Sequence, residues 1–157
     1  MEEAGALLEA CRACGWRLAV AETDTGGLLL ERLTAVQGSS AVVLGGVVPY
    51  ADSLKRSLLG VTAELLASFG AVSADAAAAM AEAVRERTGA DLGVATTGIA
   101  GPGGATEAKA VGLAYVAAAT AAGSRVREYR WSGDRTQNRE SSARAALQLA
   151  LQLLPQK

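Results

Sequence analysis

Short apolar segments alternate with helix-forming segments along this chain, and the alternation limits the folds that it can adopt. The segments WRLAVAE (16–22), SAVVLGGVVPY (40–50) and DLGVATTG (91–98) are typical of buried strands, because each is short, apolar and bounded by polar or glycine-rich residues. Amphipathic or alanine-rich stretches separate them. This order indicates an α/β fold, a three-layer α/β/α sandwich with helices on both faces of one sheet.

Helical periodicity and capping residues predict the intervening helices. We expect helices over 3–14, from the TDTGG turn (23–27) to Thr34, over 52–59, over 62–68, after Ser73, and over Asp134–Leu154. Thr23 or Asp24 is the expected N-cap of the second helix. Ser73 is the expected N-cap of the alanine-rich helix, which ends before Gly89.

Two later segments, 111–119 and 125–131, flank a turn at Gly123 and predict a hairpin. A hairpin added to strands that helices connect gives a mixed, mostly parallel sheet. Gly45 and Gly46, inside the second strand, indicate a bulge or the close approach of another backbone.

The length and charge of the chain restrict its class. With 157 residues, the range 1–157 is expected to form a single domain. The net charge is −1 and no basic stripe is present, so we expect no direct contact with nucleic acid. No apolar run approaches the length of a membrane span and no secretory leader pattern is present, so we expect a cytoplasmic protein without a membrane partner.

The cysteines Cys11 and Cys14 form a CxxC pattern that allows two interpretations. A zinc site needs about four ligands, and the chain has no histidine and no further cysteine. A redox motif is expected to follow a strand and open a helix, whereas this pair ends a helix. Cys11 shares a helical face with Leu7 and Leu8, which favours a buried structural role and no metal.

Two glycine-rich turns follow predicted strands, AETDTGG (21–27) and TTGIAGPGG (96–104). Ligands of open α/β sheets bind outside the carboxyl ends of the strands, where free backbone N–H groups suit a phosphate or carboxylate. Neither turn matches a dinucleotide or triphosphate fingerprint, and each alone is compatible with a structural role. Together they predict substrate binding by Thr25, Gly26, Gly27, Thr97, Gly98, Gly101, Gly103 and Gly104.

Arg135 and Arg139 lie one turn apart at the start of the last helix. Positive charge at a helix N-terminus opposes the helix dipole unless an anion compensates it. The pair therefore indicates either surface charge, with Asp134 as the cap, or an anion site.

Ser40, Tyr50 and Lys55 could form a nucleophilic site without histidine. A serine hydroxyl needs a group that removes its proton. A lysine can accept that proton only in its neutral form, which a partly buried, electropositive setting favours. A tyrosine hydroxyl can relay or position the proton, and the apolar residues between Ser40 and Tyr50 would exclude water.

Several ordered stretches resemble the carboxy-terminal domain of CinA and its stand-alone relatives, the PncC-type nicotinamide-nucleotide amidohydrolases. They are AETDTGGLLLERLT, GSSAVVLGGVVPYADSLKRSLLGV, GAVSADAAAAMA, TTGIAGPGGATEAKAVGLAYVA and GDRTQNR. The resemblance implies a three-layer α/β/α domain, often a homodimer. It also implies hydrolysis of the carboxamide of nicotinamide mononucleotide to nicotinate mononucleotide and ammonia, with no metal or other cofactor.

The same resemblance assigns roles to individual residues. Ser40 would be the nucleophile, Lys55 the general base and Tyr50 the proton relay or orienting group. The loop Thr96–Gly104 would hold the carboxamide oxygen or the ribose phosphate, and Arg135 would face the phosphate.

Three positions depart from the family pattern. Thr23-Asp24 stands where the family usually has Ser-Cys, Asp52 replaces an asparagine, and Ala110 replaces a proline. These departures keep open an alternative function, a catalytically weakened nucleotide-binding module linked to competence or the response to DNA damage.

Overall fold

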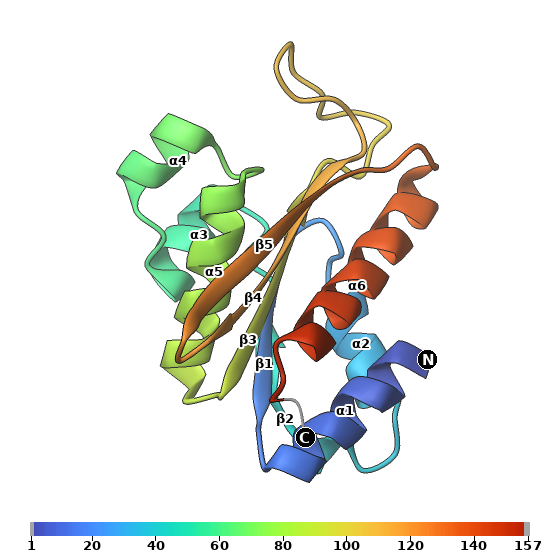
Figure 1. Ribbon diagram of the computed structural model, residues 1–157. Coiled ribbons are helices and arrows are strands. Elements are labelled where there is room, and N and C mark those ends of the chain that lie inside the picture. Colours follow the sequence, from blue (N-terminus) through green and yellow to red (C-terminus); the bar gives the residue numbers. More distant parts are fainter. Residues whose placement is uncertain (1, 156–157) are drawn as a thin grey trace.

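A computed structural model describes residues 2–155 of the chain and confirms the α/β/α sandwich. In this range a five-stranded sheet lies between two layers of helices, in the order β2-β1-β3-β4-β5 (Figure 1). The strands are β1 (Leu18–Glu22), β2 (Val43–Val47), β3 (Leu92–Gly98), β4 (Leu113–Thr120) and β5 (Gly123–Arg130). β4 is antiparallel to both its neighbours, and the other described strands share one direction, so the sheet is mixed and mostly parallel.

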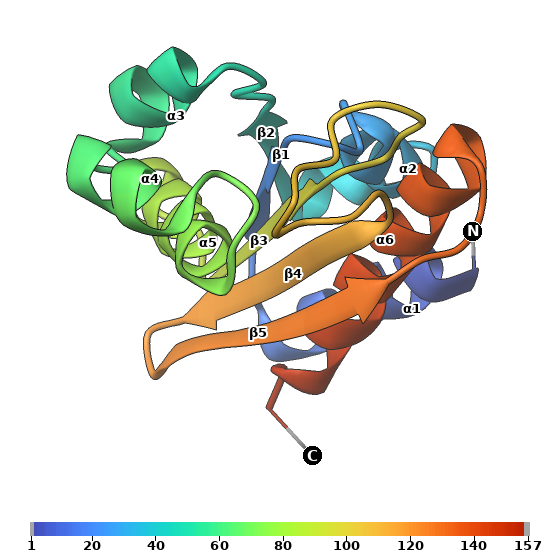
Figure 2. The same ribbon diagram turned by 90° about the horizontal axis from the view of Figure 1, so that it is seen from above.

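The helices divide into two layers (Figures 1 and 2). Their bounds are α1 Glu2–Cys14, α2 Leu28–Thr34, α3 Asp52–Leu59, α4 Ala63–Phe69, α5 Ala74–Thr88 and α6 Arg135–Gln152. α1, α2 and α6 cover one face of the sheet, and α5 covers the other, with α3 and α4 beside it. The predicted ranges are therefore confirmed for every helix except α2, which begins later than expected.

The caps explain where the long helices begin and end. The Ser73 hydroxyl accepts a hydrogen bond from the N–H of Ala76, and Gly89 ends α5 in a left-handed conformation, as expected. At α6, Asp134 and Gln137 form a capping box. The predictions for both helices are confirmed.

The two faces of the sheet carry side chains of different size. In β1, Leu18 and Val20 belong to the core that α1, α2 and α6 close, whereas Ala19 and Ala21 belong to the core beneath α5. The alanine face lets the alanine-rich α5 lie close to the sheet. A Cβ atom on Gly93 of β3 would overlap the backbone oxygen of Ala81 in α5.

The second strand is shorter than expected. Residues Ser39–Ala41 form a 3-10 turn, and β2 occupies Val43–Val47 only. A Cβ on Gly46 would lie 2.9 Å from the backbone oxygen of Val20, and the β1–β2 pairing is irregular at Leu18 and Ala19. The expected close approach of another backbone is therefore confirmed.

The CxxC pattern has a structural role. Both cysteines are free, and Cys11 is fully buried in the core beneath α1. Burial raises the pKa of the Cys11 thiol to about 12, which suits an inert side chain.

The described residues contain no helix that is long and apolar enough to cross a membrane.

We expect Gly93→Ala to destabilise the fold by about 2 kcal/mol or more, because α5 must move off the sheet to admit the methyl group. Chemical denaturation measures the change. Gly5→Ala is the matched control, since Gly5 lies in α1 with no atom near its would-be Cβ. The control should gain up to about 1 kcal/mol, and equal stability of the two variants would contradict the close packing of α5.

Candidate functional site

A cavity of about 630 Å³ lies at the carboxyl ends of β1, β2 and β3. The segments that follow these strands, together with the start of α6, form its wall. The lining residues are Thr23, Asp24, Tyr50, Asp52, Lys55, Ala71, Val72, Arg135 and residues 97–104. This is the edge of the sheet at which an open α/β fold binds its ligand.

Glu22 fixes the turn between β1 and α2. It is fully buried, and its carboxylate accepts hydrogen bonds from the N–H groups of Leu29 and Leu30, at 3.0 and 2.8 Å. The N–H of Gly27, at 3.1 Å, and the hydroxyl of Thr25 donate to the same carboxylate. The free N–H groups at the start of α2 are thus satisfied by a side chain from the preceding strand.

The expected cap of α2 differs from what the structure has, and three residues of this turn that were expected to bind substrate lie outside the cavity wall. The N-cap of α2 is Gly27, in a left-handed conformation without a side-chain bond, so Thr23 and Asp24 do not cap the helix. Thr25, Gly26 and Gly27 are absent from the cavity wall. Thr25 is instead fully buried between Glu22 and Thr96.

Arg139 also has a structural role. Its guanidinium donates to the backbone oxygens of Asp24 and Thr25, at 3.1 and 2.8 Å. It therefore holds the end of β1 against α6. Arg135, in contrast, lines the cavity and donates to the backbone oxygen of Gly101 at 2.9 Å and to the hydroxyl of Tyr50 at 3.4 Å.

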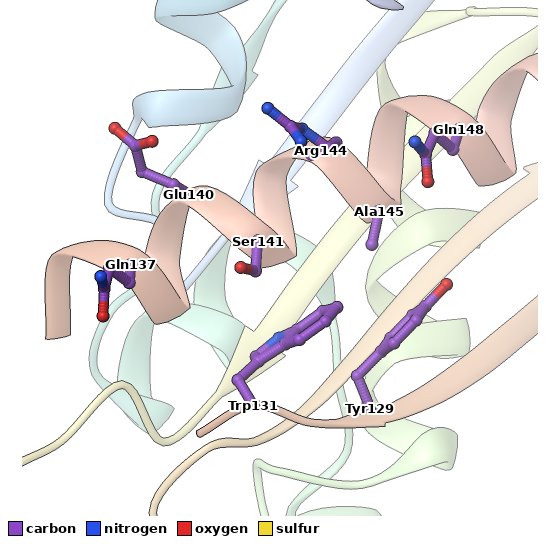
Figure 3. A pocket seen from close by; sticks show the side chains of 8 residues that line it. All are labelled: Tyr129, Trp131, Gln137, Glu140, Ser141, Arg144, Ala145 and Gln148. Carbon is purple, nitrogen blue, oxygen red and sulfur yellow. The ribbon is translucent and has the colours of Figure 1, made fainter. Parts of the chain in front are cut away.

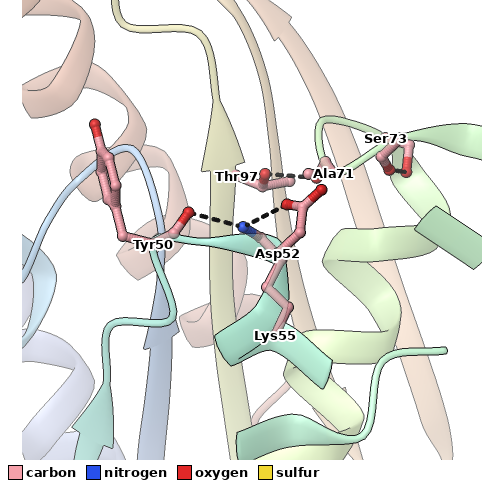
Figure 4. A network of polar contacts seen from close by, with 7 residues as sticks. Tyr50, Asp52, Lys55, Ala71, Ser73 and Thr97 are labelled. Carbon is pink, nitrogen blue, oxygen red and sulfur yellow. Dashed lines mark hydrogen bonds and ion pairs between the residues drawn. The ribbon is translucent and has the colours of Figure 1, made fainter. Parts of the chain in front are cut away.

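Lys55 is a buried amine on the cavity wall. Its side chain is 1% exposed, and Nζ donates to the backbone oxygen of Tyr50 at 3.1 Å and to Asp52 at 3.3 Å. Figure 4 shows this network and shows the Tyr50 ring directed away from the amine. The charged group in contact with Lys55 is thus a carboxylate, which differs from the electropositive setting that we expected.

Ser40 does not join Tyr50 and Lys55 within one chain. It is exposed in the turn Ser39–Ala41 before β2, whereas Tyr50 follows the carboxyl end of that strand. The five residues of β2 alone span about 16 Å. The expectation that one chain brings all three side chains into one pocket is wrong, and the catalytic role of Ser40 stays a prediction.

Ser40 does not line this cavity, whereas the polar residues Thr23 and Asp24 do. Asp24 is 6% exposed. The Oγ1 atom of Thr23 and the Oδ1 atom of Asp24 are buried and have no hydrogen-bond partner among the described residues. Leaving such atoms unpaired costs about 1–3 kcal/mol each. Two neighbouring unpaired groups on one cavity wall indicate that a ligand completes their hydrogen bonding.

Burial raises the pKa of Asp24 from 3.8 to about 6. The backbone N–H of Asp24 and the hydroxyl of Ser142 oppose this shift, and the charge of Glu22 adds to it. The carboxyl group therefore titrates close to neutral pH.

The remaining residues assigned to binding lie on the cavity wall. They are Thr97, Gly98, Gly101, Gly103, Gly104 and Arg135. The Thr97 hydroxyl donates to the backbone oxygen of Ala71 at 2.7 Å, which joins β3 to the segment before α5. A Cβ on Gly98 would lie 2.7 Å from Oδ2 of Asp24, so a residue without a side chain is needed there.

A second cavity lies between β5 and α6 (Figure 3). The stacked rings of Tyr129 and Trp131, 4.5 Å apart, form one wall, and Arg144 and Glu140 of α6 contribute to another. None of the residues predicted to act in the site lines it.

Within residues 2–155, no group of three or more His, Cys, Asp or Glu side chains is arranged to hold a metal ion.

The fold and cavity define an α/β/α domain with a ligand site at the carboxyl ends of its parallel strands. Residues 2–154 match the model of the CinA C-terminal domain, and the chain belongs to this family. It is 50% identical over 135 residues to a CinA-like protein of Acidobacterium capsulatum, covering 86% of this chain and 33% of that protein. A CinA-like protein of Geobacter sulfurreducens is also 50% identical, over 136 residues, 87% of this chain and 33% of its own length.

Solved structures of the family have the same fold. A competence/damage inducible protein from Agrobacterium tumefaciens superposes with a TM-score of 0.92 at 41% identity, over 96% of this chain and 94% of its own. The competence damage-inducible protein A from Klebsiella pneumoniae gives 0.94 at 32% identity, over 98% and 95%. The chain spans about a third of the length of the curated relatives that it matches.

We expect Glu22→Gln to destabilise the protein by about 2–3 kcal/mol, because an amide NH₂ then faces backbone N–H groups that need an acceptor. Glu31→Gln, at an exposed position in α2, is the control and should change stability by less than about 0.5 kcal/mol. Urea denaturation of both variants tests this. Equal stabilities would show that the Glu22 carboxylate does not hold the turn.

We expect Asp24→Asn to stabilise the protein more at pH 8 than at pH 4. A folded-state pKa of about 6, above the ordinary 3.8, means that the wild type loses stability as the pH rises between these values. The difference corresponds to roughly 3 kcal/mol, and the asparagine variant should not show it. Denaturation curves at both pH values measure this, with the exposed Asp75→Asn as control. Parallel pH profiles for wild type and Asp24→Asn would contradict the expectation.

Proposed function

We propose that this domain is a metal-independent amidohydrolase that cleaves the carboxamide of nicotinamide mononucleotide to nicotinate mononucleotide and ammonia. The observation that carries the proposal is a single cavity lined by both Lys55, a buried primary amine, and Thr23, whose buried hydroxyl has no hydrogen-bond partner among the described residues. An amine and a hydroxyl together supply the base and the nucleophile of amide hydrolysis without histidine. Membership of the CinA family supports it.

The anionic end of the substrate has a matching wall. Arg135 and the glycine-rich residues Gly101, Gly103 and Gly104 line the same cavity. A guanidinium group and backbone N–H groups in a glycine-rich loop are the donors that suit a phosphate. In this proposal the ribose phosphate lies against Arg135, and the carboxamide lies toward Thr23 and Lys55.

The reaction runs through an ester on Thr23. Its Oγ1 attacks the carbonyl carbon while the neutral amine of Lys55 takes the hydroxyl proton. The C–N bond then breaks, and Lys55 returns the proton to the leaving nitrogen, which departs as ammonia. Water attacks the ester with Lys55 again as the base, which releases the carboxylate product and restores Thr23.

This role requires two side chains to move when the substrate binds. The Thr23 hydroxyl is buried, so the side chain must rotate about its Cα–Cβ bond to face the cavity. The Asp52 carboxylate, which stabilises the ammonium form of Lys55, must turn away from it. Asp52 has the freedom to do so, since its side chain is 61% exposed.

A second candidate function is a nucleotide-binding module without turnover. The ion pair between Lys55 and Asp52 favours it, because an amine held as an ammonium cannot act as a base. Calorimetric binding of the nucleotide without ammonia release between pH 6 and pH 9 would support this candidate over the enzyme.

Two further expectations accompany the proposed enzyme, a cytoplasmic location and a homodimer. Ser40 is exposed before β2, on the far side of that strand from the cavity of its own chain, so a catalytic role for Ser40 would require the cavity of a second copy.

The test of the enzyme is ammonia release from nicotinamide mononucleotide. We expect Thr23→Ala to lower kcat by roughly 10³-fold or more, whereas Thr23→Ser, which keeps a hydroxyl, should retain turnover. Ser40→Ala is the matched control and should retain wild-type kcat. Loss of turnover in Ser40→Ala with retention in Thr23→Ala would transfer the nucleophile to Ser40 from a second copy.

A further inference from the structure

Asp24 is a buried carboxyl group on the cavity wall for which the proposed reaction has no use. It is 6% exposed, its Oδ1 has no partner among the described residues, and its Oδ2 lies beside Gly98. An ionised carboxylate accepts about four hydrogen bonds. The Ser142 hydroxyl and backbone N–H groups use part of this capacity, and Oδ1 leaves part of it unused. Because Oδ1 is covered, the side chain must turn toward the cavity for a ligand to bond to it.

The charged groups around Asp24 do not neutralise it. Within the described residues no salt bridge joins Asp24 to a cation, because each neighbouring cation is engaged elsewhere. Six ionisable side chains from three parts of the fold lie around Asp24. They are Glu22 on β1, Tyr50, Asp52 and Lys55 before and on α3, and Arg135 and Arg139 on α6. Of these, Lys55 pairs with Asp52, while Arg135 and Arg139 donate to backbone oxygens. β3 contributes no ionisable side chain to this wall.

The position of Asp24 next to Thr23 decides which part of a substrate it meets. A hydroxyl that attacks an amide must lie about 3 Å from the carbonyl carbon. The amide nitrogen is bonded to that carbon, and Asp24 lines the same cavity as Thr23, so the proposed orientation places the amide nitrogen on the Asp24 side of the cavity. A primary amide offers two N–H donors, whereas a carboxylate offers none and carries a negative charge.

We propose that Asp24 selects a primary carboxamide over the corresponding carboxylate, by accepting a hydrogen bond from the amide NH₂ group and repelling a carboxylate in its place. This inference rests on the proposed function for the orientation of the ligand. It adds a specificity-determining residue at a position where the family pattern has a cysteine, which carries no comparable charge.

The selectivity depends on pH. Ionised Asp24 accepts from the amide and repels the acid, while protonated Asp24 can donate a hydrogen bond to the acid. Burial raises the pKa of Asp24 to about 6, so the preference for the amide is present above this pH and declines as the pH falls through it.

The test is the ratio of affinities for nicotinamide mononucleotide and nicotinate mononucleotide, measured by calorimetry from pH 5.5 to pH 8.5. The Thr23→Ala background prevents turnover. Both ligands carry the same phosphate and pyridinium ring, so their titration cancels in the ratio. We expect a preference for the amide of at least about 10-fold at pH 8, which declines at pH 5.5. Asp24→Asn in the same background should remove both the preference and its pH dependence.

Asp75→Asn is the control, because it removes an exposed carboxylate from α5 that does not line the cavity. It should keep the preference and its pH dependence. Equal affinity for the two ligands in the parent protein, absence of amide binding, or an unchanged ratio in Asp24→Asn would overturn the role of Asp24. Absence of ammonia release from the wild type with the expected ratio would overturn the proposed enzyme and leave amide selection in place.

Discussion

The hydrogen bonds that Glu22 accepts are the constraint on which the site depends. A carboxylate at the end of β1 takes the place of a side-chain cap on α2 and closes the turn that follows the strand. Arg139 holds the same turn from α6. Because both contacts restrict the backbone of this turn, Thr23 and Asp24 stay on the cavity wall, with the Thr23 hydroxyl and the Oδ1 atom of Asp24 unpaired among the described residues. Leaving these two atoms without hydrogen bonds lowers the stability of the fold, and such a cost is typical of binding sites, where a ligand supplies the missing hydrogen bonds.

The sheet topology assembles the rest of the site. Parallel strands place the segments after β1, β2 and β3 at one edge, so Asp24, Lys55 and Thr97 meet although they are far apart in sequence. The β4–β5 hairpin then returns the chain to α6, whose first residue is Arg135. The walls of the cavity thus come from different connections between strands and helices, and the chemistry is divided among loops that the sheet holds in place.

Much of this arrangement could be predicted from the sequence. Periodicity and caps located α3, α5 and α6, because their signals are local. The sequence does not predict the turn after β1, since the start of α2 is capped by Glu22, a residue inside the preceding strand, and no local rule assigns it. Chemistry and resemblance group Ser40 with Tyr50 and Lys55, but neither contains information on the direction of β2. The departure from the family pattern at Thr23 and Asp24 was the available signal that these residues matter.

The unequal faces of the sheet have a consequence for how this domain can diverge. Beneath α5 most of the buried residues are alanines, and Gly93 packs against the backbone of Ala81, so there is less side-chain volume to redistribute. On the opposite face, leucines of α1, α2 and α6 pack against leucines and valines of the sheet and can exchange volume with them. Substitutions of core residues should therefore occur mostly in the layer formed by α1, α2 and α6. The alanine-rich α5 should change less, because its close contact with the sheet leaves less room for other side chains.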